Sequence, residues 1–433
     1  MKNKKIIFII VGIIIFISVA ICFGLALKKY KDNPKTTTTT TTSSKDTVSL
    51  SSNKITKGGT YKITGNNECI EIDTNDSVEL DLENATITCK NGPAINIVSS
   101  DKTTIVLTGE NTITSTTTED LDGAIYSKDD LILSGTGSLK ITSNLDGIVS
   151  KDDLIINGGT YIINSEDDGI RGKDSVEITS GTFTINAGGD GIKTTTEEDK
   201  EKGYITITGG TFTINSVNDG IQAVTNLNIK DGTFTIKTTG DPNTDSAKGL
   251  KSDSLITIDG GTFDIDTTDD SIHSDGNIVI NKGKFTIKSN DDGIHADGMA
   301  EIKDGEIDVT AAEGIEATYV KIDGGTINIS ASDDGINAGN KSNDYSVKVE
   351  INGGNITVKM GQGDTDGVDS NGDIIINGGT INVTGQSTFD YDGTGVINGG
   401  TVICNGEKVT TLPNQFMGGG MGGPGENRMP GMR

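Results

Sequence analysis

The sequence lacks tryptophan, contains only two histidines, and draws only 4% of its 433 residues from Phe and Tyr. So few large rings exclude a globular core built on aromatic side chains, and Ile, Val and Leu must form the core instead. Positive charge is also scarce, because 36 Lys and Arg stand against 62 Asp and Glu and leave a net charge of −26. This balance excludes nucleic acid as a partner, since phosphates need Lys and Arg. It is typical of a secreted protein that carries cations.

The one long hydrophobic run lies at the N-terminus. Residues 6–27 are apolar and have lysines on both sides, and the run is long enough to span a bilayer. We expect residues 1–31 to be a membrane anchor; the alternative is a cleaved signal peptide, for which Gly24-Leu25-Ala26 offers a small-residue cleavage site. Either segment would place the rest of the chain outside the cell. A Thr-rich linker (32–46) and a Gly- and Met-rich tail (413–433) lack the apolar residues of a core.

A short motif recurs about every 22 residues between these ends. One copy reads Asp-Asp-Gly-Ile-His-Ala at 291–296, and a second signature, Ile-x-Gly-Gly-Thr-Phe, recurs in step with it, as at 207–212. The motif glycine stands at 123, 147, 169, 191, 220, 249, 293, 314, 335, 367 and 393, with Ser271 in one further slot. A period of this length indicates a solenoid, in which each repeat buries its apolar side only by stacking on the next.

Three short segments of alternating polarity, separated by Asp-Asp-Gly, Gly-Gly or Lys-Asp turns, make up each repeat. We therefore predict an all-β domain over 47–412, a right-handed parallel β-helix of about 14 coils with three strands per coil. A left-handed hexapeptide helix would show a period of about 18. The predicted inward columns are an isoleucine column that runs from Ile156 to Ile397 and a phenylalanine column of Phe183, Phe212, Phe234, Phe263 and Phe285.

The cysteines give no clear disulfide framework. The spacing of Cys69 and Cys89 suggests a bond. Their aligned positions, however, fall on different strands, so we expect buried free thiols. Cys89 and Cys404 are expected in the inward slot that Ile185 occupies in its own repeat.

The residue after the motif isoleucine is expected to point outward. Along the chain these residues are Tyr126, Val149, Arg171, Lys193, Gln222, Lys251, His273, His295, Glu316, Asn337 and Asp369. The first half is largely basic and the second largely acidic. Insertions bracket this strand at 116–120, 195–203, 239–247, 339–346 and 360–365. Because insertions in repeat proteins tend to rim a binding face, we predict that this face binds a ligand; the alternative is a solvated strand with loops placed where they are tolerated.

A column of acids stands just before the motif glycine. Its members are Asp122, Asp146, Asp168, Asp190, Asp219, Asp270, Asp292, Glu313, Asp334, Asp366 and Asp392. Carboxylates stacked about 5 Å apart repel one another, so a cation is expected among them, and calcium prefers oxygen ligands at flexible geometry. The densest group predicts the metal ligands Asp291, Asp292, Glu313, Glu316, Asp333, Asp334, Asp366 and Asp369. The alternative is turn chemistry, in which each carboxylate caps a backbone amide.

Several side chains of the outward-pointing strand are candidate ligand contacts. The predicted ligand-binding residues are Tyr126, Arg171, Lys193, Lys251, His273 and His295. The Arg and Lys residues favour an anionic ligand. The two histidines stand in adjacent repeats and have the chemistry to ligate a transition metal, but no clear third ligand accompanies them.

The repeated Asp-Asp-Gly-Ile copies at 167–172, 291–296 and 333–338, with Ile-x-Gly-Gly-Thr-Phe, resemble a family of secreted bacterial carbohydrate-binding domains. The resemblance covers roughly 47–412. It implies a right-handed parallel β-helix, similar in fold to family 9 polysaccharide (pectate) lyases, that binds calcium and plant cell-wall polysaccharides such as polygalacturonate and cellulose. In the related lyases a calcium ion grips the substrate carboxylate and a Lys abstracts a proton, a role open here to Lys193 or Lys251.

The leading interpretation is a calcium-dependent polysaccharide-binding protein at the cell surface, monomeric and without catalytic residues. The absence of Trp disfavours a flat platform for crystalline cellulose, with Tyr126 and Tyr391 as the stacking candidates, and favours acidic glycans. Two alternatives stay open, namely a calcium-dependent polysaccharide lyase and a structural surface rod or adhesin.

Overall fold

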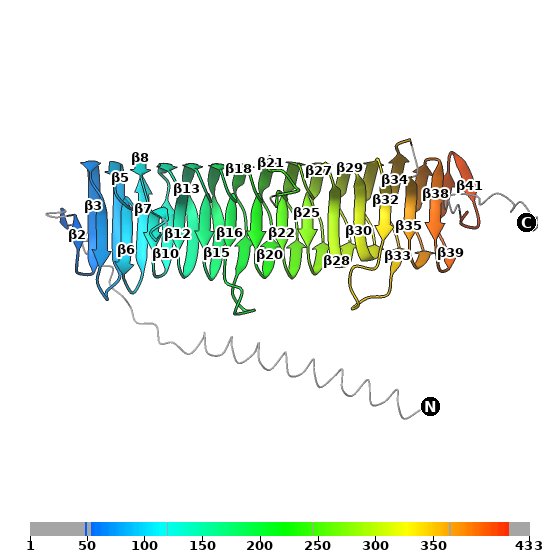
Figure 1. Ribbon diagram of the computed structural model, residues 1–433, viewed down its shortest axis with the longest axis horizontal. Helices are drawn as coiled ribbons and strands as arrows, with labels where there is room; N and C mark the ends of the chain where they lie inside the picture. The colour runs from blue at the N-terminus through cyan, green and yellow to red at the C-terminus, as the bar shows by residue number, and fades with distance from the viewer. Residues whose placement is uncertain (1–47, 50–52, 119, 245, 363–364, 415–433) are drawn as a thin grey trace, which may run out of the picture. The chain divides into compact units, whose positions relative to one another are not determined.

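Alternating apolar and polar residues make the described part of the chain all-β. The computed structural model describes residues 48–49, 53–118, 120–244, 246–362 and 365–414, which form strands and turns. Apart from the last strand, each strand pairs in parallel with an equivalent strand of a neighbouring repeat, so the chain winds into stacked coils (Figure 1). Within these residues no helix has the length and apolarity to cross a membrane. The predicted anchor, the linker and residues 415–433 of the tail lie outside the described part.

The strands form three stacks that run along the coils. Stack 1 contains β2 (Lys54–Ile55), β4 (Ile70–Asp73), β6 (Ile95–Ser99), β9 (Gly123–Ser127), β12 (Asp146–Ser150), β14 (Ile170–Gly172), β16 (Ile192–Thr194), β19 (Ile221–Ala223), β22 (Leu250–Ser252), β25 (Ile272–Ser274), the first halves of β28 (Asp292–Ile302) and β30 (Glu313–Ile322), β32 (Asp334–Ala338), β35 (Asp366–Ser370) and β38 (Ser387–Tyr391).

Stack 2 contains β1 (Val48–Ser49), the first halves of β3 (Gly59–Asn67) and β5 (Val78–Cys89), β7 (Thr103–Thr108), β10 (Leu131–Gly135), the first halves of β13 (Asp153–Ser165) and β15 (Ser175–Ala187), β17 (Tyr204–Ile207), β20 (Asn226–Ile229), β23 (Leu255–Ile258), β26 (Asn277–Ile280), the second halves of β28 and β30, β33 (Lys348–Ile351), β36 (Asp373–Ile376) and β39 (Gly395–Ile397).

Stack 3 contains the second halves of β3, β5, β13 and β15, with β8 (Glu110–Ser115), β11 (Ser138–Ser143), β18 (Thr211–Ser216), β21 (Thr233–Thr238), β24 (Thr262–Thr267), β27 (Lys284–Ser289), β29 (Glu306–Ala311), β31 (Thr326–Ala331), β34 (Asn355–Met360), β37 (Thr380–Thr384) and β40 (Thr401–Cys404). At the end of this stack β41 (Glu407–Val409) pairs with β40 in antiparallel fashion.

The core consists of columns of identical or similar side chains. The predicted isoleucine column is buried from Ile156 to Ile376 and half-buried at Ile397. The predicted phenylalanine column is also buried, and Tyr161 begins it. Its rings are stacked with centroids 4.7–5.0 Å apart. This spacing equals the distance between neighbouring strands, so the backbone pairing sets the ring stacking.

The motif glycine is required because adjacent coils approach closely at its Cα. A Cβ added at Gly220 would lie 2.5 Å from the carbonyl oxygen of Gly249 and 2.5 Å from Ile236 Cγ2. Gly147, Gly169 and Gly191 face the same two kinds of atom. The glycine thus lets the turn into stack 1 lie against both the next coil and the core, which explains why it recurs in nearly every repeat.

Replacing Gly220 with Ala should lower the free energy of unfolding by about 2 kcal/mol, because the added methyl overpacks the junction between coils. Gly209 is the matched control, since its added Cβ would find its nearest neighbour 3.6 Å away. Urea denaturation of both variants checks the prediction. Equal stability of the two variants would contradict it.

A disulfide between Cys69 and Cys89 corrects the expectation of free thiols. The pairing of β3 with β5 places Asn67 opposite Ile87, so positions 69 and 89 occupy equivalent places in adjacent coils, with Cα atoms 4.8 Å apart. Cys89 lies opposite Ser115 and therefore not in the slot of Ile185. The predicted alignment was wrong by two residues, since Ile87 and not Cys89 continues the column of Ile185. Cys404 is half-buried and does continue the column of Ile185 through Val383.

Candidate binding face on stack 1

One polar column follows stack 1 in strict register. Parallel pairing aligns Tyr126, Val149, Arg171, Lys193, Gln222, Lys251, His273, His295, Glu316, Asn337, Asp369 and Asp390. We call this set the outward column. Its alignment was predicted correctly up to Asp369, and Asp390 extends it.

The first members of the outward column are not open to a ligand. Tyr126 is only 5% exposed and Val149 is fully buried. The Lys151 ammonium lies 5.5 Å from the centroid of the Tyr126 ring and covers it. The expectation that Tyr126 presents an outward ring for stacking is therefore wrong, and the accessible part of the column begins at Arg171.

The acid column lies beside the outward column and caps the backbone. Along much of the column, one carboxylate oxygen accepts a hydrogen bond from a main-chain N–H of the next coil: Asp146 from Asp168 (3.0 Å), Asp168 from Asp190 (2.8 Å), Asp190 from Asp219 (2.8 Å), Asp219 from Lys248 (2.8 Å), Asp270 from Asp292 (3.0 Å) and Asp334 from Asp366 (3.1 Å). The turn-chemistry alternative thus accounts for one oxygen of each of these carboxylates. The other oxygen is left to face the outward column.

The end of the acid column was misaligned by the sequence pattern. Asp366 pairs with Ser387, and Val368 pairs with Phe389. Thr388 therefore takes the place of the motif glycine in β38, and Gly393 and Asp392 lie beyond the strand. The Asp392-Gly393 pair in the turn after β38 has the same sequence as the motif and was taken for a copy of it.

Cations of the chain itself neutralise the first part of the acid column. Arg171 contacts Asp122 and lies 2.7 Å from Asp146. Lys193 lies 2.6 Å from Asp190 and 3.4 Å from Asp168. Repulsion within this part of the column is therefore relieved without a bound metal ion.

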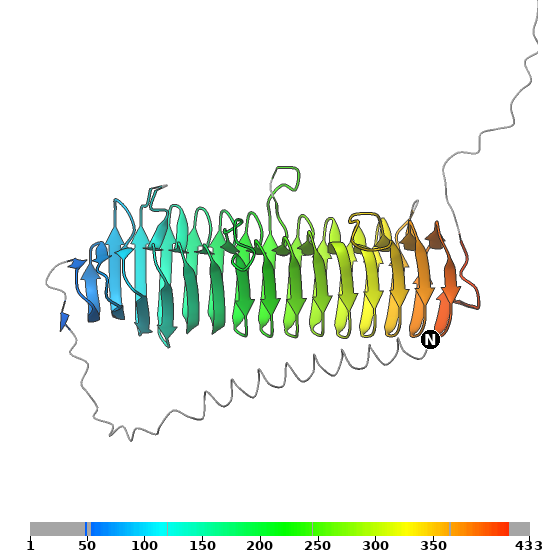
Figure 2. The same cartoon turned by 90° about the horizontal axis from the view of Figure 1, so that it is seen from below.

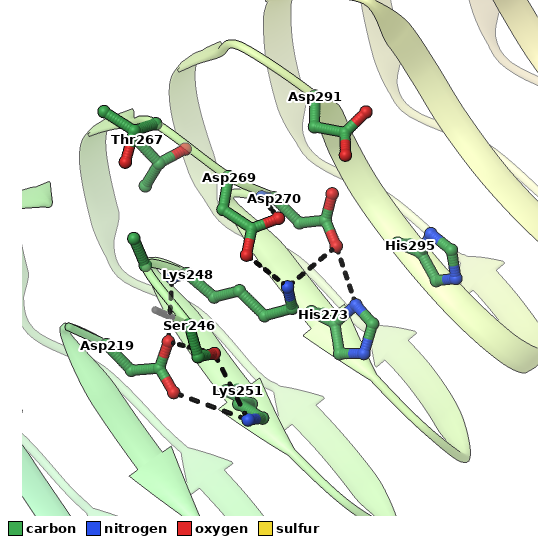
Figure 3. A network of polar contacts seen from close by, with 12 residues as sticks. Asp219, Ser246, Lys248, Lys251, Thr267, Asp269, Asp270, His273, Asp291 and His295 are labelled. Carbon is green, nitrogen blue, oxygen red and sulfur yellow. Dashed lines mark hydrogen bonds and ion pairs between the residues drawn. The ribbon is translucent and has the colours of Figure 1, made fainter. Parts of the chain in front are cut away.

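The same arrangement continues in the next coils, where loop residues take part (Figure 3). Lys248 lies 2.5 Å from Asp269 and 3.5 Å from Asp270. Lys251 lies 3.6 Å from Asp219. Ser246, from the insertion before β22, donates a hydrogen bond to Asp219. This loop projects beyond the coils at its tip (Figure 2), while its C-terminal residues complete the polar network.

Both histidines are held between carboxylates. His273 Nδ1 lies 2.8 Å from Asp270 Oδ2, and its Nε2 lies 2.8 Å from Asp275. His295 Nδ1 lies 2.6 Å from Asp292 Oδ2 and 3.0 Å from Glu316 Oε2. Burial lowers the pKa of His295, but the hydrogen bonds that its ring donates to the Asp292 and Glu316 carboxylates outweigh burial and raise that pKa above its ordinary value. Hydrogen bonds to carboxylates therefore hold both imidazoles in place on this face.

The C-terminal part of the face keeps acids without cationic partners. Among the described residues no Lys, Arg or His forms an ion pair with Glu313, Asp334 or Asp369, although Lys341 lies 2.9 Å from the neighbouring Glu316. Burial, and then the neighbouring acids, raise the pKa of Glu313 and of Asp334 to about 7 and that of Asp369 to about 6. We call Glu313, Asp334 and Asp369 the acidic end.

The predicted metal ligands fall into separate groups. In the described part of the chain, ligand atoms close enough to share one ion occur in Asp292, His295 and Glu316, and in Asp269, Asp270 and Asp291. Further groups are Asp270 with His273 and His295, Asp146 with Asp167 and Asp168, and Asp130 with Asp152 and Asp153. No such group is formed by the remaining predicted ligands, which are Glu313, Asp333, Asp334, Asp366 and Asp369. Asp334 and Asp366 are nevertheless opposite one another where β32 pairs with β35.

Sequence reasoning missed two lysines of this face. Lys248 stands in the slot where other repeats carry the acid, and Lys341 comes from the insertion after β32, which projects below the coils in Figure 1. The break in the acid column at 248 was a usable signal for the first. No pattern marks the second, because a loop residue has no equivalent in other repeats.

The chain belongs to a family of carbohydrate-binding domains. The family described as carbohydrate-binding domain-containing protein matches residues 50–293 and 288–411, which together are most of the chain. A solved structure, the polysaccharide lyase-like protein from C. thermocellum as a gadolinium derivative, is 31% identical; the match covers 49% of this chain and 86% of that one, with a TM-score of 0.42. No curated protein matches the chain.

Proposed function

We propose that this protein binds polysaccharide along the accessible part of the outward column, with calcium at the acidic end. Family membership supports a carbohydrate ligand. The observation that carries the calcium proposal is the lack of cationic partners for Glu313, Asp334 and Asp369 on a face where Arg171, Lys193 and Lys248 pair with acids of the first part. A hard dication that accepts several oxygens would remove this repulsion.

A second observation supports a cation at the acidic end. The Thr365 hydroxyl, next to Asp366, is 3% exposed and has no hydrogen-bond partner among the described residues. The carbonyl oxygen of the Asn337 amide is likewise buried without a partner. Both are neutral oxygens of the kind that calcium adds to carboxylates. Of the predicted ligands, those of the acidic end are therefore preferred over Asp292 and Glu316, which already hold His295.

The polysaccharide we propose is acidic, with polygalacturonate as the candidate and cellulose as the alternative. Calcium bridges carboxylates of protein and sugar, and Arg171, Lys193, Lys251 and the two histidines offer charge-assisted hydrogen bonds beside it. The Cys69–Cys89 disulfide supports an oxidising location outside the cell, at the surface or secreted. The same proposal includes membrane anchoring through residues 6–27, a monomeric state and about 14 right-handed coils.

A polysaccharide lyase is the second candidate, and Lys193 does not suit it. Burial lowers the pKa of Lys193, but Asp190 and Asp168 raise it to about 12. A general base works best with a pKa near the working pH, so a firmly protonated ammonium is a poor proton acceptor. This weighs against Lys193 and leaves Lys251 as the candidate base; we favour binding without catalysis. A structural rod or adhesin remains the third candidate.

The proposal is tested by titrating the full chain with polygalacturonate in a calorimeter, first with calcium and then with excess chelator. We expect binding heat with calcium only. Asp334→Asn combined with Asp369→Asn should weaken binding at least about tenfold, because the ion loses two anionic ligands. The matched control is Asp264→Asn with Asp308→Asn, two exposed acids on stack 3.

The outcomes separate the candidates. Heat that persists in chelator would refute the calcium site and leave binding by the cationic half of the face. No heat in either condition would refute an acidic glycan and favour a neutral one or the rod. Unsaturated uronate ends in the calcium mixture would identify a lyase.

A further inference from the structure

The only two histidines of the chain stand one above the other on stack 1. Their rings are stacked with centroids 4.8 Å apart, and each side chain is largely buried, at 14% and 13% exposure. Each Nδ1 points to the acid column and each Nε2 to an aspartate at the other end of the short strand. The carboxylates that enclose these imidazoles belong to the same ligand types as histidine itself, since both bind metal ions.

We propose that Asp292, His295 and Glu316 bind one divalent transition metal ion of the Zn²⁺ class. His295 Nδ1 lies 2.6 Å from Asp292 Oδ2 and 3.0 Å from Glu316 Oε2, and all three atoms lie within 4.8 Å of one another. Tetrahedral ligands bound about 2.1 Å from zinc lie about 3.4 Å apart. The three atoms are thus close to the separations of a coordinated set, and the ion would replace the proton that they share.

The chemistry of the three side chains selects this class of metal. Imidazole nitrogen suits zinc and its neighbours in the first transition series, whereas calcium prefers oxygen alone. Asp292 and Glu316 balance the charge of a dication. Lys341 contacts Oε1 of Glu316, which leaves Oε2 for the ion. His295 Nε2 faces Asp297 at 3.4 Å, the outer contact that commonly orients a metal-bound histidine.

The neighbouring coil offers a competing group, Asp270 with His273 and His295. Asp270 Oδ2, however, already faces both His273 and the ammonium of Lys248, at 2.8 and 3.5 Å. The positive charge of Lys248 beside Asp270 Oδ2 would repel a metal ion bound there. The group that contains Glu316 is therefore the better site, and His273 lies beside it without being a ligand.

Three protein ligands leave a coordination position for water or another oxygen. Since the outward column is polar and His295 reaches solvent, that position would open onto the proposed binding face. The metal site does not depend on the polysaccharide proposal, because zinc binding is measured without any sugar and in the presence of excess calcium.

The test is a calorimetric titration of the full chain, free of any histidine tag and stripped of metal, with Zn²⁺ in excess Ca²⁺. We expect one Zn²⁺ per chain. His295→Gln should weaken binding by about 100-fold or more, since even loss of an outer contact costs about 10–100-fold. Glu316→Gln should also weaken it, and His273→Gln, the matched control, should retain wild-type affinity. Cobalt bound in place of zinc should give visible ligand-field absorption in the wild type and none in His295→Gln.

Each other result overturns the assignment. Absence of Zn²⁺ binding, or unchanged affinity in His295→Gln, would show that the cluster is an ion-pair network only. Loss of binding in His273→Gln with retention in Glu316→Gln would move the site to the Asp270 group. If the Glu316 variant fails to fold, the cobalt spectrum of His273→Gln still separates the two groups, because it persists only if His273 is not a ligand.

Discussion

Replacing Arg171 with Met should lower the free energy of unfolding by about 3–5 kcal/mol, since the change leaves buried carboxylates without a partner. Asp146 is fully buried, and Arg171 lies 2.7 Å from its Oδ2 atom, which has no hydrogen bond of its own. The same guanidinium contacts Asp122 in one coil and lies 4.0 Å from Asp168 in another. Because Met keeps much of the packing of the aliphatic part of Arg171, the lost stability measures mainly the effect of removing the positive charge.

Urea denaturation at neutral pH measures this effect, and Lys237→Met is the control. Lys237 pairs with Asp266 at 3.3 Å on the exposed side of stack 3, where an ion pair is worth about 0–1 kcal/mol. Adding Asp146→Asn to Arg171→Met should restore part of the lost stability, because it removes the unpaired charge. If Arg171→Met cost no more than Lys237→Met, the acid column would have to be protonated in the native protein.

The repeat in the sequence was sufficient to predict the columns of this fold. Parallel strands stack equivalent residues, so aligning the motif copies also aligned the side chains, and the buried Phe183 column and the outward column of Arg171 and His295 followed. The prediction failed at the two ends of the repeat region, where the copies of the motif were aligned incorrectly. The Cys69–Cys89 bond was missed at one end, and Asp392 was misplaced at the other.

Which cation lies beside which acid could not be predicted from the repeat. Periodicity places the Cα of Asp168, but a lysine side chain can reach either neighbouring coil, as Lys193 does. Lys341 reaches Glu316 from a loop that has no counterpart in other repeats. The sequence therefore predicted repulsion along the whole acid column, whereas cations of the chain relieve it in the first part and leave it at the acidic end.

In chelator, the protein should lose stability as the pH rises from about 4 to about 8, owing to the acidic end. Burial raises the pKa of Glu313 and of Asp334 to about 7 and that of Asp369 to about 6, above the values of the unfolded chain. The folded state therefore holds these protons more tightly, and the stabilisation is complete below about pH 4 and is lost as the pH rises through about 6 to 7. Because the three carboxyls are partly solvated, we expect a total of about 3 kcal/mol after screening.

Thermal denaturation with and without calcium, at pH 5 and pH 7.5, checks this prediction. Protons and calcium compete for the same oxygens, so calcium should raise the Tm at pH 7.5 much more than at pH 5. Asp334→Asn with Asp369→Asn should flatten the pH dependence in chelator and remove most of the calcium effect. Other buried acids, including Asp146, have a raised pKa and contribute to the slope in both proteins, so the difference between variant and wild type isolates the acidic end. If that difference were absent, the slope would come from the first part of the column, and calcium would have no preferred place among Glu313, Asp334 and Asp369.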